Sequence, residues 1–263
     1  MRILLGFILV FTVIGAQGPL QPVSVLYAGS LVTQMEGPIA TSLRAKGIDL
    51  QGEPGGSKAL AHLISSGLRT PDAFISVDPS LIAGLGRRIV SSVTFASTQL
   101  GIGWTEHSRD AALFESVAAG KTTMLAALQT PGLRIGRTDP RIDPKGTYTV
   151  EGVELLAGPK REHLILGSDE NSDQTFPEET LLARLETNEI DLGFFYRTEA
   201  VAKGLRFLAL PGKAALADRI TYTLAILRGA PHPATAKRFA AFLIHGKGRA
   251  ILEKAGLIYR LHH

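Results

Sequence analysis

The sequence predicts an α/β protein of two lobes, each with a mixed, mostly parallel sheet flanked by helices. Apolar runs typical of buried strands alternate with segments of helical periodicity, and this alternation indicates βαβ units. About nine strands are expected, which is many for one open sheet, so two lobes are favoured over one. The length of 263 residues is enough for two domains of ordinary size.

The composition excludes several classes of protein. With 45% hydrophobic and 20% charged residues, the chain is not disordered. Its net charge of +4 comes from scattered basic residues, and only 6% of residues are aromatic, so the sequence predicts no nucleic-acid partner. The absence of cysteine excludes disulfides, thiolate nucleophiles, cysteine zinc sites and a lipid-anchored bacterial N-terminus.

The N-terminus predicts export. Met1 and Arg2 precede an apolar run over residues 3–14, and small or aliphatic residues occupy positions 13–16. We therefore interpret residues 1–16 as a cleaved signal peptide and expect an exported, soluble mature protein without a lipid. The run falls short of the ~20 residues that span a bilayer. The alternative is an N-terminal membrane anchor.

The first part of the mature chain predicts three strands and the helices between them. Short apolar runs predict strands at residues 23–28, 48–53 and 73–76. After the first strand a helical pattern runs to about Lys46, and Gly37-Pro38 is expected to kink or restart it. Residues 58–67 are expected to be helical, with Gly67 as the stop.

The same alternation continues to the C-terminus. Extended stretches are expected within residues 93–104, and further strands at 133–136, 190–196, 207–210 and 220–227. Helices are expected within 109–129, which holds two helical patterns, and at 147–157, 178–188, 234–244 and 248–255.

Ligands of open α/β sheets bind where strands end and helices begin, so these turns are the candidate ligand-binding positions. Ser30 follows the first strand in an Ala-Gly-Ser turn, and Ser57 follows the second in a Gly-Gly-Ser turn that lacks the Gly-Lys-Ser/Thr of a Walker loop. Each serine is predicted to start a helix, Ser30 as its N-cap, and to offer an anion its hydroxyl and nearby amides. The alternative is that each serine only caps its own helix.

Two further turns carry polar groups. In the segment 137–147, Pro144 fixes a helix start and leaves free amides at Lys145 and Gly146, while Asp143 is either a ligand or part of a plain turn. The helix start at residues 176–180 is paired with the strand end at Tyr196, whose hydroxyl points inward or belongs to the core.

Five segments together resemble a known family. Residues 25–31, 55–60, 138–146 and 191–197 occur in the order seen in periplasmic molybdate/tungstate-binding proteins, and residues 230–256 resemble the C-terminal helices of many solute-binding proteins of ABC transporters. The resemblance implies a two-lobed clamshell with the ligand in the interlobe cleft. It implies one lobe of residues 19–96 plus 221–263 and another of residues 97–220.

The resemblance also implies a function. The protein would capture a tetrahedral oxyanion, molybdate or tungstate, and deliver it to the membrane permease of an ABC transporter. It would be a periplasmic monomer, would need no cofactor and would not be an enzyme.

The site residues follow from the same resemblance. It implies that Ser30 and Ser57 hold the oxyanion by hydroxyls and amides, that the backbone of Lys145 and of Glu178 donates from the second lobe, and that Tyr196 donates its hydroxyl. No metal other than that of the oxyanion is implied.

Two departures from the family pattern bear on this site. Asp143 fits one of two carboxylate positions that complete an octahedral shell in some members, but the other falls at Phe195. A hydrogen-bonded tetrahedral oxyanion is therefore expected, with Asp143 the one candidate direct ligand to its metal. Lys145 replaces a small residue and either faces solvent or turns its ammonium to the dianion.

Rival functions remain at this stage. Sulfate, phosphate, a ferric complex or a small organic anion are alternative ligands, although the five tyrosines are too dispersed for a typical ferric site. A secreted hydrolase is the alternative class, but the chain has no Gly-x-Ser-x-Gly elbow and no His-Glu-x-x-His motif.

Overall fold

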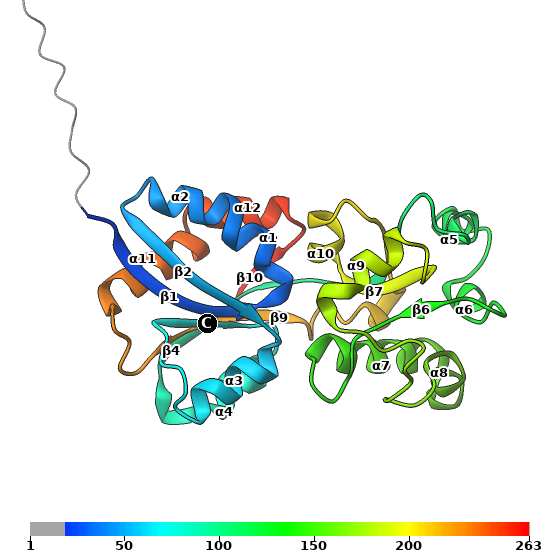
Figure 1. The fold of residues 1–263 in the computed structure, drawn as a ribbon, viewed down its shortest axis with the longest axis horizontal. Helices are drawn as coiled ribbons and strands as arrows, with labels where there is room; N and C mark the ends of the chain where they lie inside the picture. Colours follow the sequence, from blue (N-terminus) through cyan, green and yellow to red (C-terminus); the bar gives the residue numbers. More distant parts are fainter. Residues whose placement is uncertain (1–18, 263) are drawn as a thin grey trace, which may run out of the picture.

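The protein consists of two lobes, each built around one sheet, as the computed structural model shows for residues 19–262 (Figure 1). The predicted signal peptide, residues 1–16, lies outside the described residues. Among residues 19–262, no helix combines the length and the apolar character that a membrane crossing requires.

The first lobe is organised around a six-stranded sheet of order β10-β4-β9-β3-β1-β2. Its strands are β1 (Gln21–Ala28), β2 (Ile48–Gly55), β3 (Ala73–Ser76), β4 (Ile89–Ser97), β9 (Thr221–Leu227) and β10 (Ile258–His262). Both faces of the sheet are buried, because Val25 and Tyr27 pack into one apolar cluster while Leu26, between them, packs into another.

Helices cover both faces of this sheet (Figure 1). One face carries α3 (Ser57–Ser65) and α4 (Pro79–Gly84); the other carries α2 (Ala40–Arg44), α11 (Pro233–Ile244) and α12 (Lys247–Lys254). Three short helical turns and one short helix complete the lobe: η1 (Gly29–Leu31), α1 (Val32–Gln34), η2 (Met35–Ile39) and η3 (Gly86–Arg88).

The second lobe has a four-stranded sheet of order β6-β7-β5-β8. Its strands are β5 (Leu100–Trp104), β6 (Ile135–Gly136), β7 (Leu192–Tyr196) and β8 (Arg206–Ala209). Around it lie α5 (Ala111–Ala118), α6 (Met124–Leu128), α7 (Pro144–Ala157), α8 (Pro159–Leu166), α9 (Glu178–Glu186), α10 (Arg197–Ala202) and the turn η4 (Gly212–Ala215).

The chain passes between the sheets twice, after β4 and again before β9. The two connections are hydrogen-bonded to each other, since the Thr98 N–H donates to the Ile220 carbonyl at 3.1 Å. Lys58 of α3 also reaches across, and its ammonium donates to the Pro140 carbonyl and the Thr147 hydroxyl, both at 3.0 Å. These bonds hold the facing edges of the lobes together.

The predicted two-lobed α/β architecture with mixed sheets is confirmed, but the expected predominance of parallel pairs is wrong. Among the strands of residues 19–262, only β1–β2, β1–β3 and β6–β7 pair in parallel. The antiparallel pairs are β3–β9, β4–β9, β10–β4, β5–β7 and β5–β8. The antiparallel pairs arise because the chain passes between the lobes twice. As a result, β5 and β9 each enter their sheet from the other lobe rather than through a βαβ crossover.

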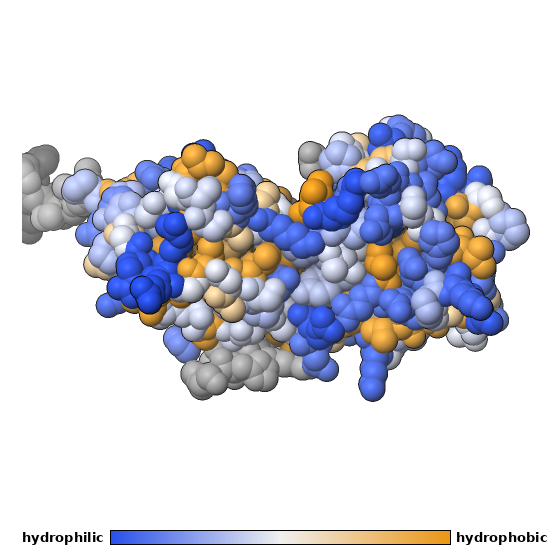
Figure 2. Space-filling model, turned by 90° about the horizontal axis from the view of Figure 1, so that it is seen from below, coloured by the Kyte–Doolittle hydropathy of each residue, from blue (hydrophilic) through white to orange (hydrophobic). Residues whose placement is uncertain are grey.

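Individual elements follow the predictions with local differences. The expected interruption at Gly37-Pro38 is confirmed, because Gly37 is non-helical and Pro38 lies within the π turn η2. Helices α4, α8 and α10 and the C-terminal strand β10 were not predicted. On the face shown in Figure 2, hydrophobic surface forms separate patches among hydrophilic residues.

Gly146 is expected to be intolerant of a side chain. A Cβ at this position in α7 would lie 2.5 Å from the Thr138 carbonyl oxygen and 2.6 Å from the Pro140 nitrogen. Because backbone rather than a flexible side chain is in the way, Gly146→Ala is expected to lower the free energy of unfolding by about 1–3 kcal/mol in urea titrations. Gly84→Ala is the control, since a Cβ there meets nothing within 4 Å. Equal stability of the two variants would contradict this packing argument.

Candidate functional site

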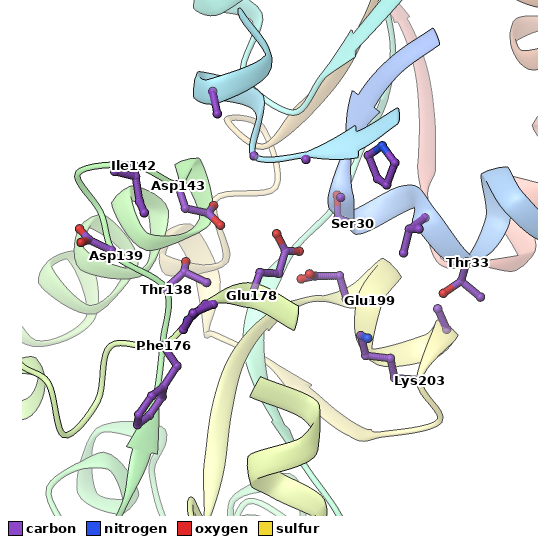
Figure 3. Close-up of a pocket in the computed structure, with 18 of the residues that line it drawn as sticks. Ser30, Thr33, Thr138, Asp139, Ile142, Asp143, Phe176, Glu178, Glu199 and Lys203 are labelled. Atoms are coloured by element: carbon purple, nitrogen blue, oxygen red, sulfur yellow. The ribbon is translucent and has the colours of Figure 1, made fainter. Parts of the chain in front are cut away.

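A cavity of about 770 Å³ lies between the two lobes (Figure 3). From the first lobe it is lined by the turns that follow β1 and β2, including Gly29, Ser30 and Gly56. The second lobe contributes residues of the turn before α7, the segment before α9 and residues in and just after α10: Thr138, Asp139, Ile142, Asp143, Thr175–Glu178, Glu199, Ala202 and Lys203. The predicted strand-to-helix turns therefore do meet at one cleft.

Ser30 lies in this cavity with its hydroxyl in a chain of hydroxyls. It is 2.9 Å from the Tyr222 hydroxyl, which is 3.3 Å from the Thr198 hydroxyl of the other lobe. Three hydroxyls bring three protons and these two bonds use two of them, so one proton is left for another acceptor. The N-cap role expected of Ser30 is wrong, because the helical turn begins at Gly29 with Ala28 as its N-cap.

Ser57 is buried beside the cavity rather than in its lining. It is the first residue of α3, as expected, and its hydroxyl oxygen accepts the Val77 N–H at 3.3 Å. The residues around this turn that line the cavity are Pro54, Gly55, Gly56 and Ala59. The Ser57 hydroxyl still has its own proton to donate.

Asp143 lines the cavity and caps α7. Its carboxylate accepts the Lys145 N–H at 2.7 Å, so the amide expected to be free for an anion is already used. Burial raises the pKa of Asp143 to about 6, while the Lys145 and Lys58 ammonium groups pull it down and Glu178 pushes it up.

The Lys145 side chain is 1% exposed, so it does not face solvent. Its ammonium lies 2.8 Å from Glu199 Oε1 and 3.2 Å from Glu178 Oε1. The ring of Phe195, which takes the place of the second expected carboxylate, has its centroid 5.6 Å from the same ammonium. Of the two expectations for Lys145, the structure therefore has the ammonium turned inward, beside the cavity.

This cluster of one ammonium and two carboxylates has a defined protonation at neutral pH. Burial opposes the charge on Glu178, but the Lys145 ammonium holds the pKa of that carboxyl down to about 2. Burial raises the pKa of Glu199 to about 8, and the charge of Glu178 adds to the rise. Lys145 stays charged because the carboxylates outweigh the burial that lowers its pKa. At neutral pH Glu199 therefore keeps its proton, whereas Glu178 is ionised.

Tyr196 is buried next to this cluster at the end of β7. Its N–H donates to Glu199 Oε2 at 2.8 Å, whereas its hydroxyl has no hydrogen-bond partner in the described part of the chain. Burial, with Asp143 nearby, raises the pKa of Tyr196 well above its ordinary value, so the hydroxyl remains a neutral donor. The Thr138 hydroxyl, in the cavity lining, also lacks a partner.

The structure thus brings the six predicted residues to one place, with Ser30, Asp143 and Glu178 in the lining and Ser57, Lys145 and Tyr196 buried beside it. Glu199, Tyr222 and Lys203 were missed. Of these, only Glu199 could have been predicted from the sequence. It follows the end of a predicted strand by three residues, which is the spacing at which a glutamate side chain accepts the N-cap amide. Among residues 19–262, no group of three or more acidic or histidine side chains is arranged to hold a metal ion.

Glu199 is expected to make stability depend on pH. The folded protein keeps this proton up to about pH 8, whereas an unperturbed glutamate loses it near 4.5. The folded state therefore binds more protons between these values, and the free energy of unfolding falls as pH rises. Glu199→Gln, which mimics the protonated form, is expected to reduce the fall between pH 5 and 8 by roughly 2 kcal/mol in urea titrations. An unchanged slope in the variant would refute this protonation state.

Comparison with known proteins gives the family. The sequence profile of the bacterial extracellular solute-binding proteins matches residues 23–258. A Haloferax volcanii protein, provisionally named as an ABC transporter molybdenum-binding protein, is 27% identical over 266 residues and is aligned over 92% of this chain and 83% of its own. The Escherichia coli molybdate-binding protein ModA is 26% identical, with 89% and 88% coverage. The solved structure of the Azotobacter vinelandii periplasmic molybdate-binding protein superposes with a TM-score of 0.66 at 18% identity, with 92% and 100% coverage. The chain belongs to the family of bacterial extracellular solute-binding proteins.

Proposed function

We propose that this protein captures a tetrahedral oxyanion, molybdate or tungstate, in the interlobe cavity and delivers it to the permease of an ABC transporter. The role is binding without turnover. The relatives named for molybdenum or molybdate span most of the chain and support this ligand class.

The observation that carries the proposal is the pair of unpartnered hydroxyls at the cavity. Buried polar groups are nearly always hydrogen-bonded, so Tyr196 and Thr138 indicate an acceptor that binds between them and the first lobe. Neutral hydroxyls suit an oxyanion because they stay donors at neutral pH and do not exchange protons with it. Charge-assisted bonds of this kind are each worth ~1.5–3 kcal/mol.

Further donors lie on both sides of the cleft. The Ser30–Tyr222–Thr198 chain has one spare proton, and the Glu178 amide is the first of α9 and therefore lacks an acceptor within its helix. Ser57 supplies a hydroxyl behind the Gly55-Gly56 turn. The Lys145 amide, in contrast, is not proposed as a donor, because Asp143 already accepts from it.

The remaining parts of the proposal concern export and closure. We propose that residues 1–16 direct export to the periplasm and are removed, and that the mature monomer divides into lobes of residues 19–96 plus 221–263 and 97–220. The ligand would bridge the lobes, and the permease would recognise the closed form.

Titration calorimetry of residues 17–263 tests the ligand. Molybdate and tungstate are expected to bind at one site with a measurable heat of binding. Sulfate is expected to bind more weakly, because its smaller radius leaves donors from the two lobes badly placed. Phosphate is included in the same series as a second smaller anion. Heat from sulfate or phosphate alone, or from none of the four, would reject the proposed ligand.

Tyr196→Phe separates binding from folding. The hydroxyl it removes has no partner among residues 19–262, so thermal stability should be unchanged, while affinity for molybdate should fall about tenfold with the loss of one charge-assisted bond. Tyr259→Phe is the matched control, because its hydroxyl donates to the Leu243 carbonyl at 2.8 Å, outside the cavity. It should lower stability by about 1 kcal/mol and leave affinity unchanged. The reverse pattern would place the anion away from Tyr196.

A further inference from the structure

The side chain of Glu178 extends across the cleft. It starts from the first residue of α9 in the second lobe, lines the cavity, and its side chain is 26% exposed (Figure 3). Its other oxygen, Oε2, would be 3.3 Å from a Cβ placed on Gly29 of the first lobe. The carboxylate therefore lies against the very turn that precedes Ser30.

The charge on this carboxylate is balanced by Lys145. Its Oε1 is 3.2 Å from the ammonium, which is paired at 2.8 Å with Glu199 as well. Glu199 is held independently, through the Tyr196 N–H. If Glu178 moved away, Lys145 would retain a hydrogen-bond partner in Glu199. The charge of the Lys145 ammonium would then need another anion in place of Glu178.

Three other ionisable groups lie around Glu178 and the cavity. Asp143, from the start of α7, lines the same cavity and is negative when ionised. Lys203, from the end of α10, also lines the cavity and favours the charged form of Glu178. Lys58 is engaged with Pro140 and Thr147. A dianion beside Gly29 would thus face ionised Glu178 in contact, and like charges in contact repel strongly in a partly desolvated cleft.

We propose that the Glu178 carboxylate competes with the oxyanion for the position between Gly29 and Lys145, and that the bound oxyanion replaces it as the partner of the Lys145 ammonium. The inference rests on the proposed function and adds to it an internal competitor that sets affinity. The side chain is long and partly exposed, so it can turn toward solvent and Lys203 while its amide remains at the site. Glu178 is therefore a specificity-determining residue: only anions that interact with Lys145 and the hydroxyls better than a carboxylate does are retained.

The test compares three variants by calorimetric titration with molybdate and tungstate. Glu178→Gln keeps the backbone and the size but removes the charge, and should bind about tenfold more tightly. Glu178→Asp keeps the charge but withdraws it by one methylene from Gly29 and Lys145, and should fall between the wild type and Glu178→Gln. Glu186→Gln removes an exposed carboxylate from the same helix and should bind within about twofold of the wild type.

Thermal unfolding without ligand provides a second readout. Glu178→Gln should melt at a lower temperature than Glu186→Gln, because Lys145 loses a charged partner, yet gain more from saturating molybdate. Equal or weaker binding by Glu178→Gln, with the wild type binding normally, would overturn the competition while leaving the proposed function intact. If neither the wild type nor Glu178→Gln binds any oxyanion, the proposed function fails; binding by Glu178→Gln alone would support both. Should Glu178→Gln not fold, Glu178→Asp decides the question by the same comparison.

Discussion

The buried ammonium of Lys145 is the constraint on which the cleft depends. A charged group with 1% exposure is tolerated only when it is paired and hydrogen-bonded, and here the partners come from two other helices. Glu178 opens α9 and Glu199 lies in the first turn of α10, so the ammonium of α7 fixes how three helices approach each other. The same contact determines which groups can face a ligand.

The cluster also limits which donors the second lobe can offer a ligand. Asp143 caps α7 and thereby occupies the Lys145 amide, which removes a donor that a helix start would otherwise offer. The Tyr196 hydroxyl belongs to the same lobe and has no hydrogen-bond partner among residues 19–262. The result is a set of donors that carry no formal charge, with one buried cation behind them.

The sequence predicted the architecture well where patterns are local. Strand and helix periodicities located β1, α3 and β7 within a few residues, and the resemblance to a binding-protein family correctly implied two lobes. Strand direction was not predictable in the same way. Whether β9 pairs parallel or antiparallel with β3 depends on its return from the second lobe, and nothing in residues 221–227 encodes that path.

The candidate site was predictable as a set of turns but not as a set of contacts. Small residues and serines at strand ends placed Ser30 and Ser57 near the cleft, because strand ends of one sheet edge must meet. The partner of Ser30, however, is Tyr222, which is 192 residues away in the sequence. The partners of Lys145 are Glu178 and Glu199, which are 33 and 54 residues away. Composition at each turn cannot show that these side chains converge.

The contacts of Lys145 also determine how the cleft selects its ligand. An oxyanion pocket made only of hydroxyls and amides selects by size, since each donor must reach its oxygen. A pocket that also contains a carboxylate paired to a buried ammonium selects by charge, because an incoming anion is accepted only when it compensates Lys145 better than Glu178 does. With Phe195 in place of a second carboxylate, an apolar ring lies beside the ammonium, and Glu178 is the lining carboxylate that an incoming anion must displace from Lys145.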